Sequence, residues 1–224
     1  MIADNIHQIE AALERFPQTV RLVAVTKTKP VAMLQEAYDA GSRIFGENKV
    51  QEMTDKYPQL PQDIQWHLIG HLQSNKVKYI APFVSLIHSV DSLKLLQEIN
   101  KQAAKHNRVI DCLLQIHIAE EETKFGLSAE EARDLLHSAD VQPLTNIRLV
   151  GLMGMATNTD DEIQIRKEFR GLKQLFDQLG QFRSDNVAFA ELSMGMSGDY
   201  LIAAEEGSTL VRVGSAIFGN RSYT

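Results

Sequence analysis

Residues 22–30 read LVAVTKTKP, and this stretch decides which fold the chain can adopt. The apolar run before Thr26 is typical of a buried strand, and Pro30 suits the first position of a helix. The turn between them contains no glycine, so it lacks the fingerprint with which doubly wound sheets bind dinucleotides. The stretch therefore predicts a strand, a short loop and a helix, with Lys27 at the carboxyl end of the strand.

Short apolar runs alternate with amphipathic stretches along the rest of the chain. This alternation, after a leading helix over residues 4–15, predicts βα units, and eight such units within about 250 residues are typical of a (β/α)8 barrel. An open doubly wound sheet is the alternative, which the missing glycines disfavour. The predicted strands span residues 20–25, 43–45, 65–69, 86–90, 110–118, 148–153, 188–192 and 210–213.

Two residue pairs have the spacing of helix capping boxes: Ser128 with Glu131, and Thr159 with Glu162. Each pair predicts that a helix begins just after its serine or threonine. In the helix after residue 159, four apolar residues recur at helical spacing and predict a face turned to the core. They are Phe169, Leu172, Phe176 and Leu179.

Length and composition are those of a globular protein with one core. A chain of 224 residues buries roughly 70% of its unfolded surface, and α/β chains of this size commonly fold as one domain, here residues 1–224. Residues are 44% hydrophobic and 23% charged, without low-complexity tracts. We expect a monomer, because neither a heptad pattern nor a large apolar face stands out.

Charge and cysteine content predict a cytoplasmic protein. The net charge of −6 opposes counterion-driven binding, so we expect no nucleic-acid partner. Cys112 is the only cysteine and lies in an apolar run, which fits a reducing compartment. The first residues lack a basic region and an apolar signal core, and no apolar stretch has membrane-spanning length, so we expect no membrane association.

Lys27 is the candidate for covalent chemistry. A lysine fixed where a buried strand meets a loop can lose part of its hydration and its proton, and the neutral amine condenses with an aldehyde to a Schiff base. The alternative is that residues 26–29 form an ordinary polar loop with two solvated lysines.

Two glycine- and serine-rich loops follow the last two predicted strands, where barrels often bind phosphate. Glycines allow close approach of the backbone, and serines add neutral donors. Alternatively, the glycines only form tight turns, and Asp199 would compete with an anion for the same amides. The candidate phosphate ligands are Ser193, Ser197, Gly214 and Ser215.

Arg212 lies within the last predicted strand, where a buried guanidinium must find a partner. It could form a structural salt bridge or face a ligand in the barrel mouth. A reactive amine, a phosphate site and an arginine together suit a phosphorylated aldehyde such as pyridoxal 5′-phosphate (PLP). A permanent cation beside the pyridine nitrogen would leave that nitrogen unprotonated and the cofactor a weak electron sink.

Six motifs resemble the pyridoxal phosphate homeostasis protein family, in order, from the first strand to the end of the chain. Several of these motifs are long enough to be specific. The motifs are VAVTKTKP at 23–30, FGENKVQE at 45–52, WHLIGHLQSNK at 66–76, GLMGM at 151–155, LSMGMS at 192–197 and VRVGSAIFG at 211–219.

The resemblance implies a barrel similar to the amino-terminal domain of alanine racemase, with PLP as an internal aldimine on Lys27. Arg212 would then face the pyridine nitrogen, and Asn48 and Met155 would lie beside the cofactor. Ser193, Ser197, Gly214 and Ser215 would hold its phosphate. Residue 215 departs from the common pattern only in being serine instead of threonine, which keeps the hydroxyl.

The resemblance further implies a regulator or carrier of vitamin B6 without catalysis, with PLP-dependent apoenzymes as partners. Racemisation needs acid or base groups on both faces of the cofactor, and the chain offers no obvious second group beside Lys27. A racemase, an aldolase and an interaction protein that reports vitamin B6 status stay open as alternatives.

A metal site is not expected. His67 and His71 are four residues apart, but they fall in and after a predicted strand instead of on a helix. A third ligand is not evident, so both are interpreted as core or loop histidines.

Overall fold

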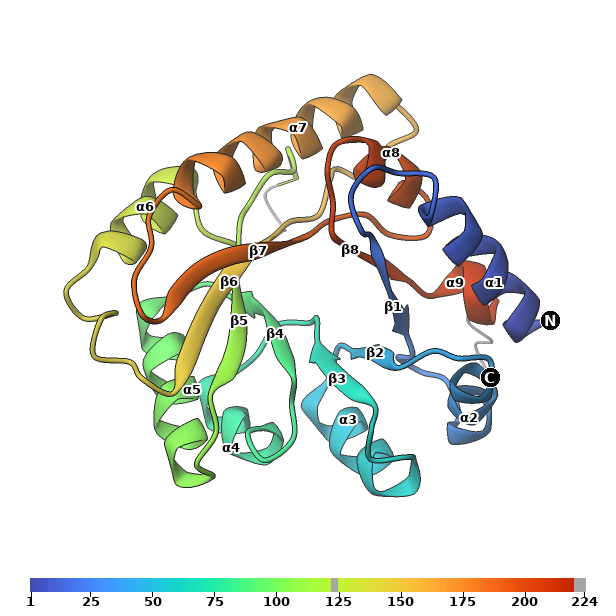
Figure 1. The fold of residues 1–224 in the computed structure, drawn as a ribbon, viewed down its shortest axis with the longest axis horizontal. Coiled ribbons are helices and arrows are strands. Elements are labelled where there is room, and N and C mark those ends of the chain that lie inside the picture. Colours follow the sequence, from blue (N-terminus) through green and yellow to red (C-terminus); the bar gives the residue numbers. More distant parts are fainter. Residues whose placement is uncertain (122–124, 220–224) are drawn as a thin grey trace.

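A computed structural model describes residues 1–121 and 125–219. Eight parallel strands pair in chain order, and β8 closes onto β1 to form a barrel. Helices surround the strands on the outside (Figure 1). The (β/α)8 prediction is confirmed.

All eight predicted strands are present. The largest difference is at the end of β5, which stops at Gln115 because Ile116 bridges to Leu127 and His117 donates its backbone N–H to the Leu127 carbonyl. The strands are β1 (Arg21–Val25), β2 (Ile44–Glu47), β3 (Gln65–Leu68), β4 (Leu86–Val90), β5 (Ile110–Gln115), β6 (Ile147–Met153), β7 (Val187–Ser193) and β8 (Leu210–Val213).

The helices follow the strands as expected of βα units. α1 precedes the barrel, and in Figure 1 it lies beside α9. The helices are α1 (Ile2–Leu13), α2 (Val31–Asp39), α3 (Val50–Lys56), α4 (Val77–Ile80), α5 (Leu93–Lys105), α6 (Ala129–His137), α7 (Glu162–Leu179), α8 (Tyr200–Glu205) and α9 (Ser215–Phe218), with 3-10 turns η1 (Tyr57–Gln59) and η2 (Ser74–Lys76).

One of the two capping boxes is present. Ser128 and Glu131 cap α6 reciprocally, as predicted. The box expected at Thr159 is wrong, because the N-cap of α7 is Asp161, two residues later, whose carboxylate accepts the backbone N–H groups of Ile163 and Gln164. Aspartate is at least as good an N-cap as threonine, so the nearer carboxylate takes the position.

Two apolar layers stabilise the barrel. Between strands and helices, Phe169 and Leu172 of α7 are fully buried, as the spacing predicted. Cys112 lies in the same layer, where burial raises the pKa of its thiol. A smaller cluster fills the barrel from within, with side chains from five strands: Val23, Leu86, Leu113, Val150, Met153 and Leu210.

Within residues 1–121 and 125–219, no helix is both long and apolar enough to cross a membrane.

Candidate functional site

The carboxyl ends of the strands gather most of the predicted site residues at one mouth of the barrel. Lys27 lies two residues beyond β1, and Asn48 directly follows β2. Ser197 and Gly214 follow β7 and β8. Parallel strands of a closed barrel end at the same face, so side chains far apart in sequence meet there.

The Lys27 loop is tight and partly strained. Lys27 itself is half-buried. The carbonyl of Thr26 accepts the N–H of Lys29 at 3.1 Å, which closes the turn. Thr28 has a φ of 62°, a left-handed conformation that β-branched residues rarely adopt. Contacts from outside the loop must therefore hold this backbone in place.

These contacts come from a buried ionic cluster, defined as Glu47, Glu52 and Lys56. The Nζ of Lys56 donates to Oε1 of Glu47 and to Oε1 of Glu52, each at 2.7 Å. It donates a third bond, at 2.8 Å, to the carbonyl of Thr26. The three protons of the ammonium group are thus all used.

The two carboxylates of the ionic cluster reach both sides of Lys27. Glu47 accepts the hydroxyl proton of Thr26 at 2.5 Å, and Glu52 accepts the backbone N–H of Thr28. Burial raises the pKa of Glu47, which is fully buried, while Lys56 and Thr26 oppose that shift. Lys56 is therefore needed to keep a charged carboxylate in this place.

The loops after β7 and β8 bring Ser197, Gly214 and Ser215 together. The hydroxyl oxygen of Ser197 accepts the backbone N–H of Gly214 at 3.2 Å and that of Ala216 at 3.5 Å. Two amides therefore converge on one oxygen beside the exposed Ser215. Such an arrangement can bind an oxyanion without a lysine or arginine.

Gly195 allows the first of these loops to pack closely. Its φ is 97°, and a Cβ atom there would lie 2.5 Å from the Cβ of Ala203 in α8. The predicted competition from Asp199 takes a different form, because its Oδ1 accepts the N–H of Met196 at 2.6 Å.

A polar chain crosses the barrel interior from β8 to β3. Arg212 donates from Nη1 to the Ser193 hydroxyl and from Nη2 to the Gly154 carbonyl at 3.1 Å. Ser193 Oγ lies 2.9 Å from Nδ1 of His88, and His88 Nε2 lies 2.9 Å from Nδ1 of His67. Arginine only donates, so we assign the serine proton to His88 and the Nε2 proton of His88 to His67.

Burial keeps this polar chain at one positive charge. Burial, together with the charge of Arg21, lowers the pKa of His67 to about 3. Burial also lowers the pKa of His88 well below its usual range, with His67 and Arg212 adding to the shift. The Arg212 pKa is lowered to about 10, mainly by burial, so the guanidinium stays the cation near neutral pH.

Ser193 lies inside the barrel, apart from the loop that contains Ser197. Its side chain is fully buried in the barrel, and its hydroxyl bonds to Arg212 and His88. Ser193 is the last residue of β7 and points inward, whereas Ser197 lies in the loop beyond it. Residue type alone could not separate these two serines.

Asn48 and Met155 lie at the same mouth, both half-buried. Gly70 lets the loop after β3 pass against Asn48, because a Cβ atom at residue 70 would lie 2.3 Å from the Asn48 carbonyl oxygen. Met155 packs against the apolar cluster inside the barrel. Asn48 also lines a cavity of about 460 Å³, together with Lys49, His71 and Lys76.

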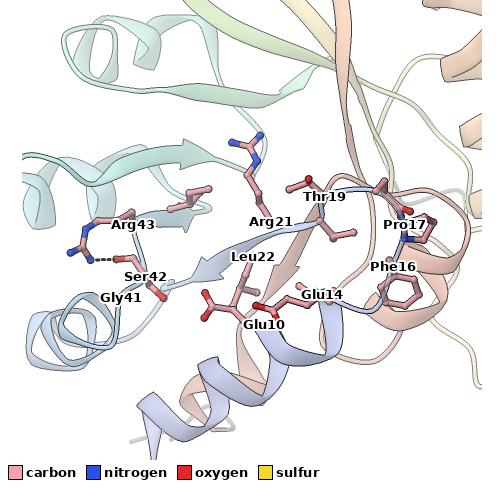
Figure 2. A pocket seen from close by; sticks show the side chains of 14 residues that line it. Glu10, Glu14, Phe16, Pro17, Thr19, Arg21, Leu22, Gly41, Ser42 and Arg43 are labelled. Carbon is pink, nitrogen blue, oxygen red and sulfur yellow. Dashed lines mark hydrogen bonds between the residues drawn. The ribbon is translucent and has the colours of Figure 1, made fainter.

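A second cavity, of about 490 Å³, lies at the opposite end of the barrel, around the starts of β1 and β2. Figure 2 shows some of its lining residues: Glu10 of α1, Glu14 just after that helix, Arg21 of β1 and Arg43 in the loop before β2. Barrel enzymes use the carboxyl ends of their strands, so this cavity is not the candidate site.

The two histidines set aside as metal ligands are separated. His67 is buried in the polar chain, while His71 is half-exposed and lies 3.9 Å from Asp91. In the described part of the chain, no three histidine, cysteine, aspartate or glutamate side chains are grouped to hold a metal ion.

Sequence reasoning missed His88 and assigned no role to Glu47, Glu52 or Lys56. His88 could have been noticed as a polar residue amid the apolar run of residues 86–90. Glu52 and Lys56 have the i, i+4 spacing of a helix pair, but that spacing is ordinarily a surface feature. Nothing local indicates that this pair is buried against the Lys27 loop.

The donor set of the mouth fits a phosphorylated aldehyde. Converging amides and hydroxyls at residues 197 and 214–216 suit a phosphate group. Lys27 supplies an amine at the neighbouring strand β1, since β1 pairs with β8. Arg212 of β8 supplies a buried cation, which donates to Ser193 and to the Gly154 carbonyl.

A family model matches nearly the whole chain. Residues 1–222 match the model described as the amino-terminal domain of alanine racemase. The pyridoxal phosphate homeostasis protein of Aquifex aeolicus is 40% identical over 222 residues, which cover 97% of this chain and 96% of that protein. The protein of the same name from Escherichia coli K12 is 35% identical, covering 100% and 95%.

Solved structures agree with the sequence comparison. PipY of Synechococcus elongatus PCC7942, without PLP, superposes with a TM-score of 0.89 at 34% identity, covering 98% of this chain and 100% of that one. PipY with PLP bound gives a TM-score of 0.86 at 34% identity, over the same shares. Alanine racemase of Clostridium difficile 630 shares the fold at 14% identity, with a TM-score of 0.77, and the match covers 56% of that chain. The chain belongs to the pyridoxal phosphate homeostasis protein family.

Proposed function

We propose that this protein binds PLP covalently through Lys27 and takes part in vitamin B6 and amino acid homeostasis as a carrier or regulator without catalysis. The observation that supports this most is the convergence of Lys27, the amides of Gly214 and Ala216, and buried Arg212 at one barrel mouth. The name of the relatives and the PLP-bound structure of PipY support the identity of the ligand.

Each residue has a distinct role in this proposal. Lys27 supplies the amine that joins the aldehyde as an internal aldimine. Ser197, Gly214 and Ser215 bind the phosphate with neutral donors, and Asn48 and Met155 line the mouth. Ser193 stays a prediction as a further phosphate ligand, and its hydroxyl accepts a hydrogen bond from Arg212.

The environment of Arg212 supports a noncatalytic role. Its guanidinium is held by a hydroxyl and a carbonyl, and the adjoining histidines are neutral near pH 7. A cation facing the pyridine nitrogen leaves that nitrogen unprotonated, and bound PLP then supplies only weak stabilisation of a carbanion. Such a site stores the aldehyde better than it activates an amino acid.

Transfer of the cofactor tests the carrier role. PLP-loaded protein and a PLP-dependent apoenzyme are either mixed directly or separated by a membrane that only free PLP can cross. The recovery of apoenzyme activity is followed in both arrangements. We expect faster recovery in direct contact than across the membrane, and loss of this difference in the Lys27→Arg variant. Equal rates in both arrangements would refute direct delivery and leave storage as the role.

Exchange of the α-hydrogen tests the racemase alternative, which the shared fold with alanine racemase motivates. Alanine and other amino acids are incubated with the loaded protein in deuterium oxide. We expect no exchange above that of free PLP. Exchange that depends on Lys27 would make the protein an enzyme. An aldolase would instead be trapped by borohydride only in the presence of its substrate.

We also propose that residues 1–224 act as one domain and as a monomer in the cytoplasm. These proposals rest on length, patterning and cysteine content. Size-exclusion chromatography with light scattering tests the oligomeric state, and a dimer would refute that part of the proposal.

A further inference from the structure

The ionic cluster of Glu47, Glu52 and Lys56 encloses the peptide units on both sides of Lys27. Lys56 holds the carbonyl of Thr26 at 2.8 Å, and Glu47 holds the hydroxyl of the same residue at 2.5 Å. Glu52 accepts the N–H of Thr28. Contacts separated by 21 to 30 residues in sequence thus converge on the loop that presents the lysine.

These contacts compensate a backbone that the loop would not adopt alone. Thr28 has a φ of 62°, and a threonine in this conformation is unfavourable because its branched Cβ crowds the backbone. Strained residues persist where their surroundings over-determine them, and they gather at functional sites. The hydrogen bond from Thr28 to Glu52 fixes the strained residue from outside.

The cluster is too buried to be an ordinary surface pair. The exposed fraction of the side chain is 8% for Lys56, 0% for Glu47 and 23% for Glu52. An ion group at this depth adds little to stability compared with apolar packing, so its presence calls for a role in specifying a conformation. The conformation that it specifies is that of residues 26–28.

We propose that Lys56, Glu47 and Glu52 are positioning residues that aim the amine of Lys27 at the cofactor aldehyde. They contact the loop that carries Lys27, so we expect them to act on covalent attachment and not on noncovalent binding of PLP. This inference rests on the proposed attachment at Lys27. The sequence motif around Lys27 does not indicate these residues, because all three lie on β2 and α3.

A double-mutant cycle with Lys27 tests the proposal. Glu52→Ala removes the acceptor of the Thr28 N–H, and the matched variant Glu52→Gln keeps an oxygen at that place. PLP affinity is measured by equilibrium dialysis for each variant, with Lys27 present and in the Lys27→Ala background. We expect Glu52→Ala to weaken binding about tenfold with Lys27 present, because misplacing a reacting group is costly. We expect less than about twofold loss in the Lys27→Ala background and in Glu52→Gln.

Lys56→Met, combined with Glu47→Gln to avoid an unpaired buried charge, provides a second and stronger perturbation. A readout on the protein without PLP accompanies both variants: hydrogen exchange of the peptide that contains residues 26–29. We expect faster exchange of this peptide and unchanged exchange in β8. If a variant fails to fold, the cycle is completed with Glu52→Ala, whose side chain is partly exposed.

The outcomes separate this proposal from the proposed function. Equal loss of affinity in both Lys27 backgrounds, or no loss in either, would overturn the positioning role. If Lys27→Ala alone leaves PLP affinity and borohydride trapping unchanged, covalent attachment at Lys27 is wrong, and the positioning role fails with it.

Discussion

The two sides of the barrel mouth are held in different ways. On the lysine side, charged side chains from β2 and α3 fix the loop after β1 through three hydrogen bonds, and two more join these side chains to one another. On the phosphate side, backbone amides and a serine hydroxyl meet in the loops after β7 and β8. One side orders a long flexible amine with buried ions, and the other presents small neutral donors.

The difference suits the function that we propose for each side. An amine that forms a covalent bond needs a defined direction. A lysine side chain has several freely rotating bonds, so a fixed backbone reduces the number of directions that its amine can take. A phosphate needs several donors from different directions, which glycine-rich backbone provides without long side chains. Arg212 and the polar chain inside the barrel lie between the two sides and belong to neither.

The largest effect is expected from removing the lysine side's amine. Lys27→Arg keeps the positive charge but cannot form a Schiff base, so the yellow colour of the PLP-loaded protein should be lost completely. Absorbance spectra with PLP and with pyridoxal measure this, and Lys101→Arg on the exposed face of α5 is the matched control. Retained colour in Lys27→Arg would mean that another amine is used.

Replacing Arg212 should weaken the binding of PLP and of pyridoxal equally. Arg212→Gln removes a charged donor from the ring nitrogen, and hydrogen bonds to charged groups contribute about 1.5–3 kcal/mol, so affinity should fall roughly 10- to 100-fold. The loss should be the same for PLP and pyridoxal, since both contain the ring. A loss restricted to PLP would place Arg212 at the phosphate and contradict the assignment.

Ser197→Ala should weaken the binding of PLP but not that of pyridoxal. One hydroxyl is lost while the amides of Gly214 and Ala216 remain, so PLP affinity should fall about tenfold. Pyridoxal lacks the phosphate, and its affinity should stay the same. Titration of both ligands with wild type and Ser197→Ala measures the ratio, and equal weakening of the two would remove residue 197 from the phosphate site.

A separate effect, on stability instead of binding, is a pH dependence from the buried histidines of the polar chain. The pKa of His67 is about 3 in the folded state and about 6.5 when unfolded, so the unfolded state binds more protons below about pH 6.5. The histidine contribution is complete above that pH and is lost as pH falls toward 3, at about 1.4 kcal/mol per pH unit for each buried histidine.

Urea unfolding at several pH values measures this slope. The variant His67→Gln keeps a side-chain acceptor for His88 and removes one titrating group, so the slope of unfolding free energy against pH should decrease by about 1.4 kcal/mol per unit. An unchanged slope would show that His67 is solvated in the folded protein, contrary to its burial.

The fold was largely predictable from sequence, because its signals are local, and the candidate phosphate residues after the last strands stay a prediction. Each strand is visible in the sequence as a short apolar run. Gly214 and Ser215 directly follow the last of these runs. The end of β5 and the start of α7 were misplaced, since a long-range bridge at Ile116 and the nearer carboxylate of Asp161 decided those boundaries.

The lysine side was predictable only at Lys27 itself. Its supporting bonds join residues 21 to 30 positions apart, and no local pattern shows that Lys56 turns inward. The same limit explains Ser193, whose inward direction at the end of β7 separates it from Ser197 in space although the two are close in sequence. Side-chain direction along a strand depends on register, which the closed barrel sets.

Mass spectrometry after borohydride reduction tests covalent attachment at Lys27 most directly. Protein loaded with PLP is reduced, digested and mapped, so that each modified lysine is identified. We predict one pyridoxyl phosphate adduct, on the peptide that contains Lys27 and at that side chain. An adduct on Lys29 or spread over surface lysines, with Lys27 unmodified, would contradict the account.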